Sequence, residues 1–216
     1  SFHLVRWDAD GGCTEPFDGN CGISQFWSAE RDVAKQVLID ANGKYVVAGY
    51  AGTNPNNTSG DHDFAILRWD TNGDLDTSFS SDGKRFVTFE DNRNDYGTSA
   101  ALQSDGKIVL AGYSKNASGN WDIAIARLNT DGTLDTDFST DGKVTTDVNG
   151  GDVIQGMAIQ SDGKIVVVGT VNYGDTSSDF LIARYTTAGA LDASFDSDGV
   201  QTVNISGEDR GLSVKL

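Results

Sequence analysis

The sequence predicts an all-β fold built from one four-stranded antiparallel unit that recurs along the chain. Two observations support this prediction. An apolar hairpin with a central Asp-Gly or Asn-Gly pair occurs three times, and an apolar stretch that ends in Arg occurs four times. The 216 residues include 26 Gly and only 2 Pro, a composition that suits many short strands joined by glycine turns. The length allows one sizeable domain or a block of a repeat array.

The hairpin is clearest at residues 158–169, where two apolar runs flank Asp162-Gly163. Equivalent hairpins occupy residues 102–112 and 39–49. Both central positions of a type I′ turn need positive φ, which Gly adopts freely and Asp or Asn tolerates, so the central pair predicts a tight two-residue turn. The second run, as at residues 165–168, is apolar on both faces, which is expected for a strand enclosed between neighbouring sheets.

The second repeated element is an apolar strand that ends in Arg. Its four copies, spaced by 62, 59 and 57 residues, end at Arg6, Arg68, Arg127 and Arg184. A Leu-Asp-x-x-Phe sequence, an Asp-Gly pair and a further short strand follow each of the last three copies. An acidic residue precedes the first strand of each hairpin, at Asp32, Asp95, Asp152 and Asp209. One period therefore contains four strands.

Four short antiparallel strands in each period of about 57 to 62 residues are typical of a β-propeller, in which each repeat forms one blade. A parallel β-helix needs shorter coils, and a single sandwich does not explain so long a period. We predict a single propeller block, divided into a partial blade at 1–31, blades at 32–94, 95–151 and 152–208, and the first strand of a further or closing blade at 209–216. About four repeats are thus represented, three whole and one split between the termini. A four-bladed ring closed by the two termini and a window of a larger ring or array both fit this pattern.

These motifs resemble the delta-60 repeat family of bacterial β-propeller repeats. The resemblance spans essentially the whole chain. It rests on the Asp-Gly-Lys hairpin whose Val/Ile run ends in Gly, on the aromatic strand that ends in Ala-Arg or Leu-Arg, and on Leu-Asp-x-Ser-Phe followed by Asp-Gly. The resemblance implies large, secreted or surface-exposed proteins made of repeated blades, and it supplies no catalytic residues.

In three repeats the Arg and the Asp of the Leu-Asp sequence are eight residues apart, which predicts three structural Arg–Asp clasps: Arg68 with Asp76, Arg127 with Asp135, and Arg184 with Asp192. Alternation along the strand places each Arg on the same face as inward-pointing apolar residues. A partly buried guanidinium needs a carboxylate or turn carbonyls as partners. A repeated anion-binding site is the alternative interpretation.

The first repeat departs from this pattern because Cys13 takes the place of Leu75 and Cys21 that of Gly83. The spacing fits neither a Cys-x-x-Cys redox pair nor a zinc knuckle. We predict a disulfide between Cys13 and Cys21, which would close the loop that the clasp holds elsewhere and which implies an oxidising compartment. A pair of free buried thiols is the alternative.

The acidic turns after the Arg strands, such as residues 70–74 and 129–132, offer oxygen ligands at alternate positions, as calcium loops do. The fourth copy, residues 186–189, has no carboxylate, and no Glu closes any of the loops. Turns capped by their own side chains explain all four copies, so no cofactor is expected.

Enzymatic activity is not expected either. Only His3 and His62 offer bases near neutral pH, and the sequence lacks a nucleophile elbow, a phosphate loop and a paired-His metal motif.

The formal net charge is −16, which counts against nucleic acid and anionic membrane surfaces as partners. No run approaches the roughly 18 apolar residues that a membrane span needs. The sequence has no starting Met and no signal peptide, so we expect it to be cut from a longer precursor. An extracellular or cell-surface location is predicted.

The sequence thus predicts a non-enzymatic structural or adhesive extracellular repeat protein, whose partners are other copies of the chain or adjacent propeller blocks in a fibre. The alternative is a glycan- or calcium-dependent binding module. The loops at residues 51–61 and 114–121 differ most between repeats, and variable loops on a rigid scaffold commonly carry binding sites. Trp121 beside the second loop is placed either to stack on a sugar ring or to pack between blades.

Overall fold

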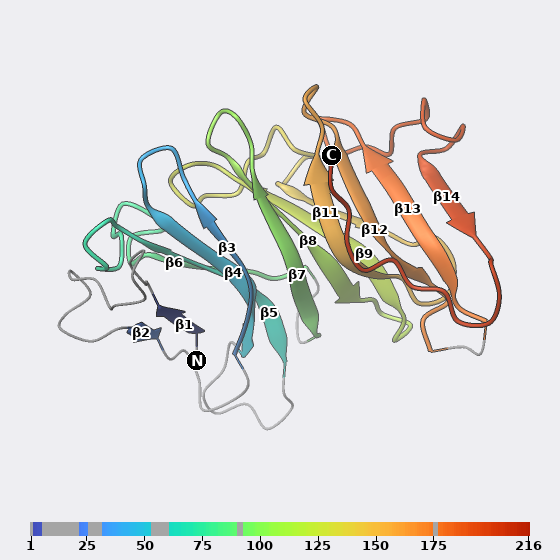
Figure 1. Ribbon diagram of the computed structural model, residues 1–216, viewed down its shortest axis with the longest axis horizontal. Helices are drawn as coiled ribbons and strands as arrows, with labels where there is room; N and C mark the ends of the chain where they lie inside the picture. Colours follow the sequence, from blue (N-terminus) through green and yellow to red (C-terminus); the bar gives the residue numbers. More distant parts are fainter. Residues whose placement is uncertain (1, 6–21, 26–31, 53–60, 90–92, 175–176) are drawn as a thin grey trace, which may run out of the picture.

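The computed structural model describes residues 2–5, 22–25, 32–52, 61–89, 93–174 and 177–216. These residues form β-strands and contain no helix, so no helix among them could span a membrane. Three four-stranded antiparallel sheets lie side by side (Figure 1). The predicted all-β architecture of four-stranded antiparallel blades is therefore confirmed.

Blade 1 consists of β3 (Val33–Ile39), β4 (Tyr45–Gly52), β5 (His62–Trp69) and β6 (Lys84–Val87). Blade 2 consists of β7 (Asp95–Leu102), β8 (Ile108–Lys115), β9 (Trp121–Leu128) and β10 (Lys143–Thr146). Blade 3 consists of β11 (Val153–Ile159), β12 (Ile165–Val171), β13 (Asp179–Tyr185) and β14 (Val200–Val203). Within each blade, neighbouring strands in the sheet are consecutive in the sequence, so each blade is a meander.

A separate two-stranded sheet, β1 (Phe2–Val5) and β2 (Gly22–Gln25), lies at the N-terminal end of the row (Figure 1). Phe2 is opposite Gln25, just as Phe64 of β5 is opposite Val87 of β6. The register of β1 and β2 is thus that of the last two strands of a blade when the first repeat is aligned without gaps.

The segment after β14 forms no regular strand, but it lies against blade 3. Asp209 N donates a hydrogen bond to Ser178 O at 2.7 Å, and the equivalent Asp152 N donates to Trp121 O at 2.6 Å. Within the described part of the chain this segment does not pair with β1 or β2, and the sheets do not close into a ring (Figure 1).

The predicted two-residue type I′ turn of the hairpins is wrong. Gly163 N donates to Gln160 O at 2.9 Å and Gln160 N donates to Lys164 O at 2.8 Å, which defines a three-residue loop. Gly163 has a φ of 83°, but Asp162 does not have a positive φ. The loop is therefore a type I turn followed by a left-handed Gly. Asp162 Oδ1 accepts a hydrogen bond from Lys164 N at 3.2 Å, a local bond that explains the Asp before the Gly.

The glycine that ends each Val/Ile run lies opposite a β-bulge in the first strand of the blade. In blade 3 the register shifts between Ile154 and Gly156, and a Cβ added at Gly169 would lie 2.0 Å from Val153 O. Gly49 and Gly112 meet the same obstacle in blades 1 and 2. No side chain fits at these positions, so the close approach of the two strands requires glycine.

The apolar core lies between blades as well as within them. One cluster combines Phe64 and Phe79 of blade 1 with Leu110 of blade 2, and a second combines Ile123 and Phe138 of blade 2 with residues of blade 3. All seven residues of β12 are buried, as expected for an enclosed second strand. Each blade therefore depends on its neighbour for the burial of its apolar side chains.

Candidate functional site

The structure brings together each Arg and Asp of the three predicted clasps. The Arg Nε donates to the Asp Oδ2 at 2.6 Å from Arg68 to Asp76, at 2.6 Å from Arg127 to Asp135, and at 2.7 Å from Arg184 to Asp192. Each Arg is near the end of a third strand, and each Asp follows the turn after that strand. The Asp N also donates to the Arg carbonyl, so backbone and side chains together hold the turn.

Sequence analysis missed the lysine of each hairpin as a third member of the clasp. The Lys Nζ lies 2.7, 3.0 and 3.0 Å from the same Asp Oδ2, in the pairs Lys44 with Asp76, Lys107 with Asp135, and Lys164 with Asp192. The Lys that follows the Asp-Gly or Asn-Gly pair carried the signal, because it recurs at one fixed position in all three hairpins. Its contact with a residue about 30 positions away depends on strand pairing and could not be derived from spacing.

The electrostatics of the clasp favour an ionised carboxylate. Burial alone would raise the pKa of Asp76, but the hydrogen bonds from Lys44 and Ser78 and the charge of Arg68 outweigh burial and hold the pKa well below its ordinary value. Hydrogen bonds from Ser194 and Lys164 lower the pKa of Asp192 in the same way. The clasp is thus a charged, hydrogen-bonded unit at ordinary pH.

Each clasp also covers the Phe of its Leu-Asp-x-x-Phe sequence. The guanidinium carbon lies 4.7 Å from the Phe79 ring centroid for Arg68, 4.8 Å from that of Phe138 for Arg127, and 5.0 Å from that of Phe195 for Arg184. A guanidinium over an aromatic face adds a cation–π attraction to the ion pair. All three guanidinium nitrogens of Arg68 are engaged, since Nη1 donates to Thr130 O at 2.5 Å and Nη2 to Ser78 Oγ at 3.2 Å, in addition to the bond from Nε. This geometry supports a structural role over a repeated anion site.

Residues of the clasp form a site that binds a turn of the following blade, here called the turn-binding site. In blade 1 the site consists of Arg68, Phe79 and Ser80. Arg68 Nη1 donates to Thr130 O, and Ser80 N donates to Asp131 O at 2.7 Å.

The equivalent residues of blade 2 are Arg127, Phe138 and Ser139. Arg127 Nη1 donates to Thr187 O at 2.6 Å, and Ser139 N donates to Ala188 O at 2.8 Å. A Cβ added at Gly189 would lie 3.1 Å from the Phe138 ring, so the glycine of the turn lies directly on the Phe. The turn-binding sites of blades 1 and 2 therefore join consecutive blades.

The turns at residues 129–132 and 186–189 are thus bound by the preceding blade. The acidic turns at residues 70–74 and 129–132 are also closed by local hydrogen bonds. Their carboxylates accept hydrogen bonds from their own backbone: Asp70 Oδ1 from Asn72 N at 2.8 Å and Asp131 Oδ1 from Thr133 N at 2.9 Å. Among the residues that the structure describes, no group of three or more His, Cys, Asp or Glu side chains is placed to hold a metal ion. Side-chain capping accounts for the acidic residues in these turns.

In blade 3 the turn-binding site consists of Arg184, Phe195 and Asp196, and it is more open. The Arg184 side chain is 19% exposed, compared with 8% for Arg68 and 7% for Arg127. Phe195 is half-buried, whereas Phe79 and Phe138 are fully buried. In the described segments no turn covers Phe195 as Gly132 and Gly189 cover the other two rings.

Trp121 belongs to an aromatic cluster of blades 1 and 2, whose neighbouring ring centroids lie 4.7 to 5.5 Å apart. The members of the cluster are Tyr50, His62, Tyr96, Tyr113 and Trp121. All five are half-buried. The equivalent positions of blade 3 are Val153, Thr170 and Ser178, so the cluster is not repeated.

The remaining candidate residues lie apart from the clasps. His62 Nδ1 lies 3.3 Å from Asn94 Oδ1, and His62 N donates to the same oxygen at 3.0 Å. Cys13, Cys21 and the side chain of His3 lie outside the described residues, so the predicted disulfide stays a prediction.

Two buried carboxyl groups lie beside the junctions between blades. Asp95 and Asp152 are fully buried, and one oxygen of each accepts a backbone hydrogen bond, from Phe89 N at 2.8 Å and from Val148 N at 2.7 Å. Burial raises the pKa of each carboxyl to about 7. Sequence analysis recognised these positions only as acidic residues that precede each hairpin.

Meander blades of four strands, joined to the next blade through a repeated turn geometry, define a β-propeller repeat protein. The sequence profile of a family described as a domain of unknown function (DUF5122) β-propeller matches residues 41–79, 103–138 and 160–195. The three matches cover just over half of the chain, which therefore belongs to this family, and the resemblance to the delta-60 repeats is confirmed. Each match runs from the hairpin turn of a blade to the Phe of its turn-binding site. No curated protein matches the chain.

Proposed function

We propose that this chain is a non-enzymatic structural or adhesive repeat protein that forms part of an extracellular or cell-surface fibre of tandem β-propeller blocks. The observation that supports this proposal is the turn-binding site. Blades 1 and 2 use it to bind the next blade, and blade 3 presents the same residues in a more open form. Further repeats or further copies of the chain are the natural partners of such a site.

Exposed apolar side chains on blade 1 and beside blade 3 are consistent with this role. Val37 of β3 is 53% exposed, whereas Ala100 and Met157, its equivalents in β7 and β11, are only 4% and 8% exposed. Leu212 and Leu216 beside blade 3 are 69% and 66% exposed. Exposed apolar surface at the edge of a stack of blades favours contact with another blade.

The charge of the chain supports an aqueous, exposed location. A net charge of −16 keeps a repeat protein soluble and limits non-specific association, while it disfavours nucleic acid and anionic lipid as partners. An extracellular location would also allow the predicted disulfide between Cys13 and Cys21 to form.

The proposal is tested by the association of the chain with its native flanking sequence present. Sedimentation velocity over a range of concentrations should show end-to-end association that weakens when Val37→Asp and Leu216→Asp are introduced together. A double change of the same charge at exposed polar positions of two hairpin tips, Ser104→Asp and Ser161→Asp, is the matched control. Electron microscopy of native extracellular material should show periodic fibres. A compact monomer at every concentration, together with an absence of fibres, would reject the proposal.

The aromatic cluster supports glycan binding as a second candidate function. Aromatic rings at a surface bind the apolar faces of sugars. Among the described residues the cluster occurs at one junction only, as expected of a single binding site. A glycan array probed with and without a calcium chelator tests this idea, with Trp121→Ala as the variant. An absence of binding to every sugar on the array, combined with an unchanged melting temperature in calcium, would reject this candidate function.

A further inference from the structure

The two junctions between blades differ at their outer rims, where the fourth strands of neighbouring blades face each other. At the junction of blades 1 and 2, Phe89 packs against Phe64 with ring centroids 5.0 Å apart. Lys143, the first residue of β10, donates from Nζ to Thr88 O at 3.0 Å and lies 5.9 Å from the Phe89 ring centroid. An aromatic ring and an ammonium group thus occupy the first junction.

At the junction of blades 2 and 3 both of these side chains are replaced by valine. Counting from the preceding Asp-Gly pair, Val148 is equivalent to Phe89, and Val200 is equivalent to Lys143. Phe to Val removes a large volume, and Lys to Val removes both volume and the cation. The backbone of the two junctions is equivalent, since Phe89 N and Val148 N both donate to the buried Asp of the following strand.

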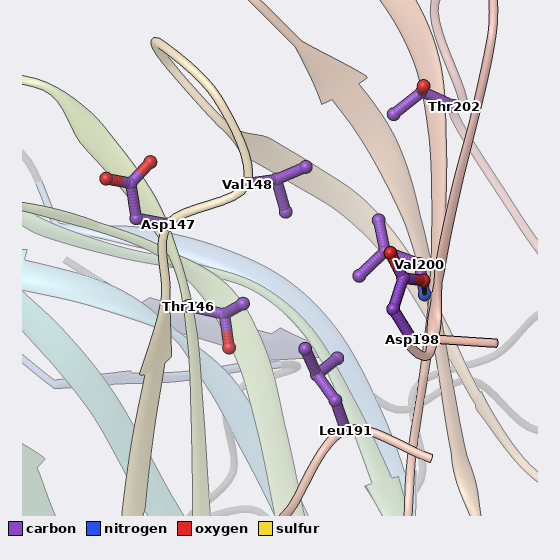
Figure 2. A pocket seen from close by; sticks show the side chains of 7 residues that line it. All are labelled: Thr146, Asp147, Val148, Leu191, Asp198, Val200 and Thr202. Carbon is purple, nitrogen blue, oxygen red and sulfur yellow. Dashed lines mark hydrogen bonds between the residues drawn. The ribbon is translucent and has the colours of Figure 1, made fainter. Parts of the chain in front are cut away.

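A cavity of about 290 Å³ lies at this position of the second junction (Figure 2). It is lined by Thr146, Asp147, Val148, Leu191, Asp198, Val200 and Thr202. Figure 2 shows Val148, Leu191 and Val200 around one space, with Asp198 beside Val200 on the side of blade 3. The Asp147 side chain points to the other side of the chain trace. The three apolar side chains are half-buried and the Asp198 carboxylate is exposed, so the cavity has apolar walls and an acidic rim.

A second cavity, of about 450 Å³, adjoins the first and shares Thr146 and Leu191 with it. It is lined by residues 143–146 of blade 2 and by residues 188–191 of blade 3, among others. The two cavities therefore follow β10 and the loop after it, from Lys143 to Val148. β10 is the edge strand of its sheet, with β9 as its neighbour, and among the described residues no strand pairs with its outer edge.

These features indicate an extended ligand. An edge strand beside a groove can pair with an added peptide strand, and a side-chain pocket at the end of the groove then provides selectivity. The first junction shows which side chains fit such a pocket, because Phe89 and Lys143 of the protein itself fill the equivalent space. The acidic rim and the net charge of −16 favour a cationic ligand.

We propose that the cavity between blades 2 and 3 binds an extended peptide segment of a partner protein that presents an aromatic side chain beside Lys or Arg. The aromatic ring would contact Val148, Leu191 and Val200, as Phe89 fills the first junction. The cationic group would lie near the carbonyl of Asp147, the equivalent of Thr88, and near the carboxylate of Asp198. The first cavity is separate from the turn-binding sites and from the aromatic cluster. The second cavity ends at the turn that blade 2 binds, since Ser139, Ala188 and Gly189 also line it.

The test uses the full chain and fluorescein-labelled peptides of about eight residues, a length that spans a strand of ordinary size. The probe carries Phe-Lys at its centre in a Ser/Thr background, and the control peptides carry Ala-Lys or Phe-Glu. Fluorescence anisotropy should show binding of the Phe-Lys peptide and an affinity at least about tenfold lower for both controls, because each lacks one of the two complementary groups.

The most informative variant places the two side chains of the first junction at the equivalent positions of the second junction. The double change V148F/V200K should fill the cavity and lower the affinity for the Phe-Lys peptide at least about tenfold. Lys84→Val, which alters the equivalent position of blade 1 away from the cavity, should leave the affinity unchanged. The proposal is overturned if no peptide of the panel binds, or if the folded V148F/V200K variant binds as the parent does.

A second measurement covers the outcome in which V148F/V200K does not fold. Hydrogen–deuterium exchange of the parent chain, with and without the Phe-Lys peptide, should show protection at residues 143–148 and 198–202. Protection confined to other blades would overturn the proposal.

Discussion

Blade 2 and blade 3 carry the same clasp residues, but their turn-binding sites differ in burial. Arg127 and Phe138 lie beneath the turn of blade 3, whereas Arg184 and Phe195 have no such cover in the described chain and are more exposed. The ion pair inside each blade is nevertheless the same, with Nε to Oδ2 distances of 2.6 and 2.7 Å. The clasp motif thus determines the fold of its own turn, and the neighbouring blade determines how deeply that turn is buried.

The largest effect of this difference is expected at the phenylalanines. Phe138→Ala should lower the free energy of unfolding by about 3 to 5 kcal/mol, because it removes a fully buried ring beneath Gly189. Phe195→Ala should cost no more than about half as much, since that ring is already in part exposed to water. Urea denaturation of the two variants measures both values. Equal losses would contradict the dependence on the neighbouring blade.

The second effect concerns the arginines. Arg127→Ala should lower the free energy of unfolding by roughly 3 kcal/mol, because it strands the buried Asp135 carboxylate and the Thr187 carbonyl. The loss lies at the lower end of the range for a buried ion pair because Lys107 still contacts Asp135. Arg184→Ala should cost distinctly less, since solvent screens the more exposed pair. Arg127→Lys serves as a control that retains charge without the guanidinium fork, and urea denaturation should place it between Arg127→Ala and the parent.

The pH dependence distinguishes the junction carboxyls from the clasp carboxylates. Folding raises the pKa of Asp95 and Asp152 from 3.8 to about 7. Between about pH 4 and 7 these two carboxyl groups are therefore protonated in the folded chain and ionised in the unfolded chain. Stability should therefore fall as pH rises from about 4 to 7. The clasp aspartates have lowered pKa values, so their contribution is lost when the pH falls below about 4.

Thermal melts between about pH 3 and 8 should thus reach their maximum near pH 4 to 5. Asp95→Asn combined with Asp152→Asn should flatten the decline towards neutral pH and leave the acid limb in place. A maximum above pH 7 in the parent chain would show that these carboxyls do not control the alkaline limb.

The smallest effect concerns the lysines, and here the two blades should agree. Lys107 and Lys164 lie 3.0 Å from their clasp aspartates, and their side chains are 27% and 30% exposed. Since each contact lies within one blade, Lys107→Met and Lys164→Met should each cost about 0.5 to 1 kcal/mol. Urea denaturation at low and high salt should show that the losses of unfolding free energy in the two variants decrease together as the salt concentration rises. A large difference between the two would mean that the lysine also contributes to the contact between blades.

Much of this arrangement is predictable from the sequence because it is local or repeated. The four-strand period, the hairpins and the pairs such as Arg68 with Asp76 follow from alternation and from fixed spacing. The type I′ turn was predicted wrongly because the Asp-Gly pair suits two loop types. Which loop forms depends on whether the pairing register leaves two or three residues between the strands.

Other contacts were beyond prediction because they join residues distant in the sequence. Arg68 meets Thr130 and Lys143 meets Thr88 only when blades are adjacent in space. No spacing rule connects such pairs, since each depends on the relative placement of two sheets. The aromatic cluster around Tyr96 and the cavity beside Val148 arise in the same way, from side chains of different blades.

The sequence by itself determined the all-β class, the four-strand repeat and the clasp within each blade, because strand alternation and tight turns are set by neighbouring residues. Only the tertiary structure decided which clasps are buried, which carboxyls are held in apolar surroundings and where a cavity remains between blades. The physical reason is that a side chain at a junction is buried only where the neighbouring sheet covers it. Repeats with the same motif therefore differ wherever their neighbours differ.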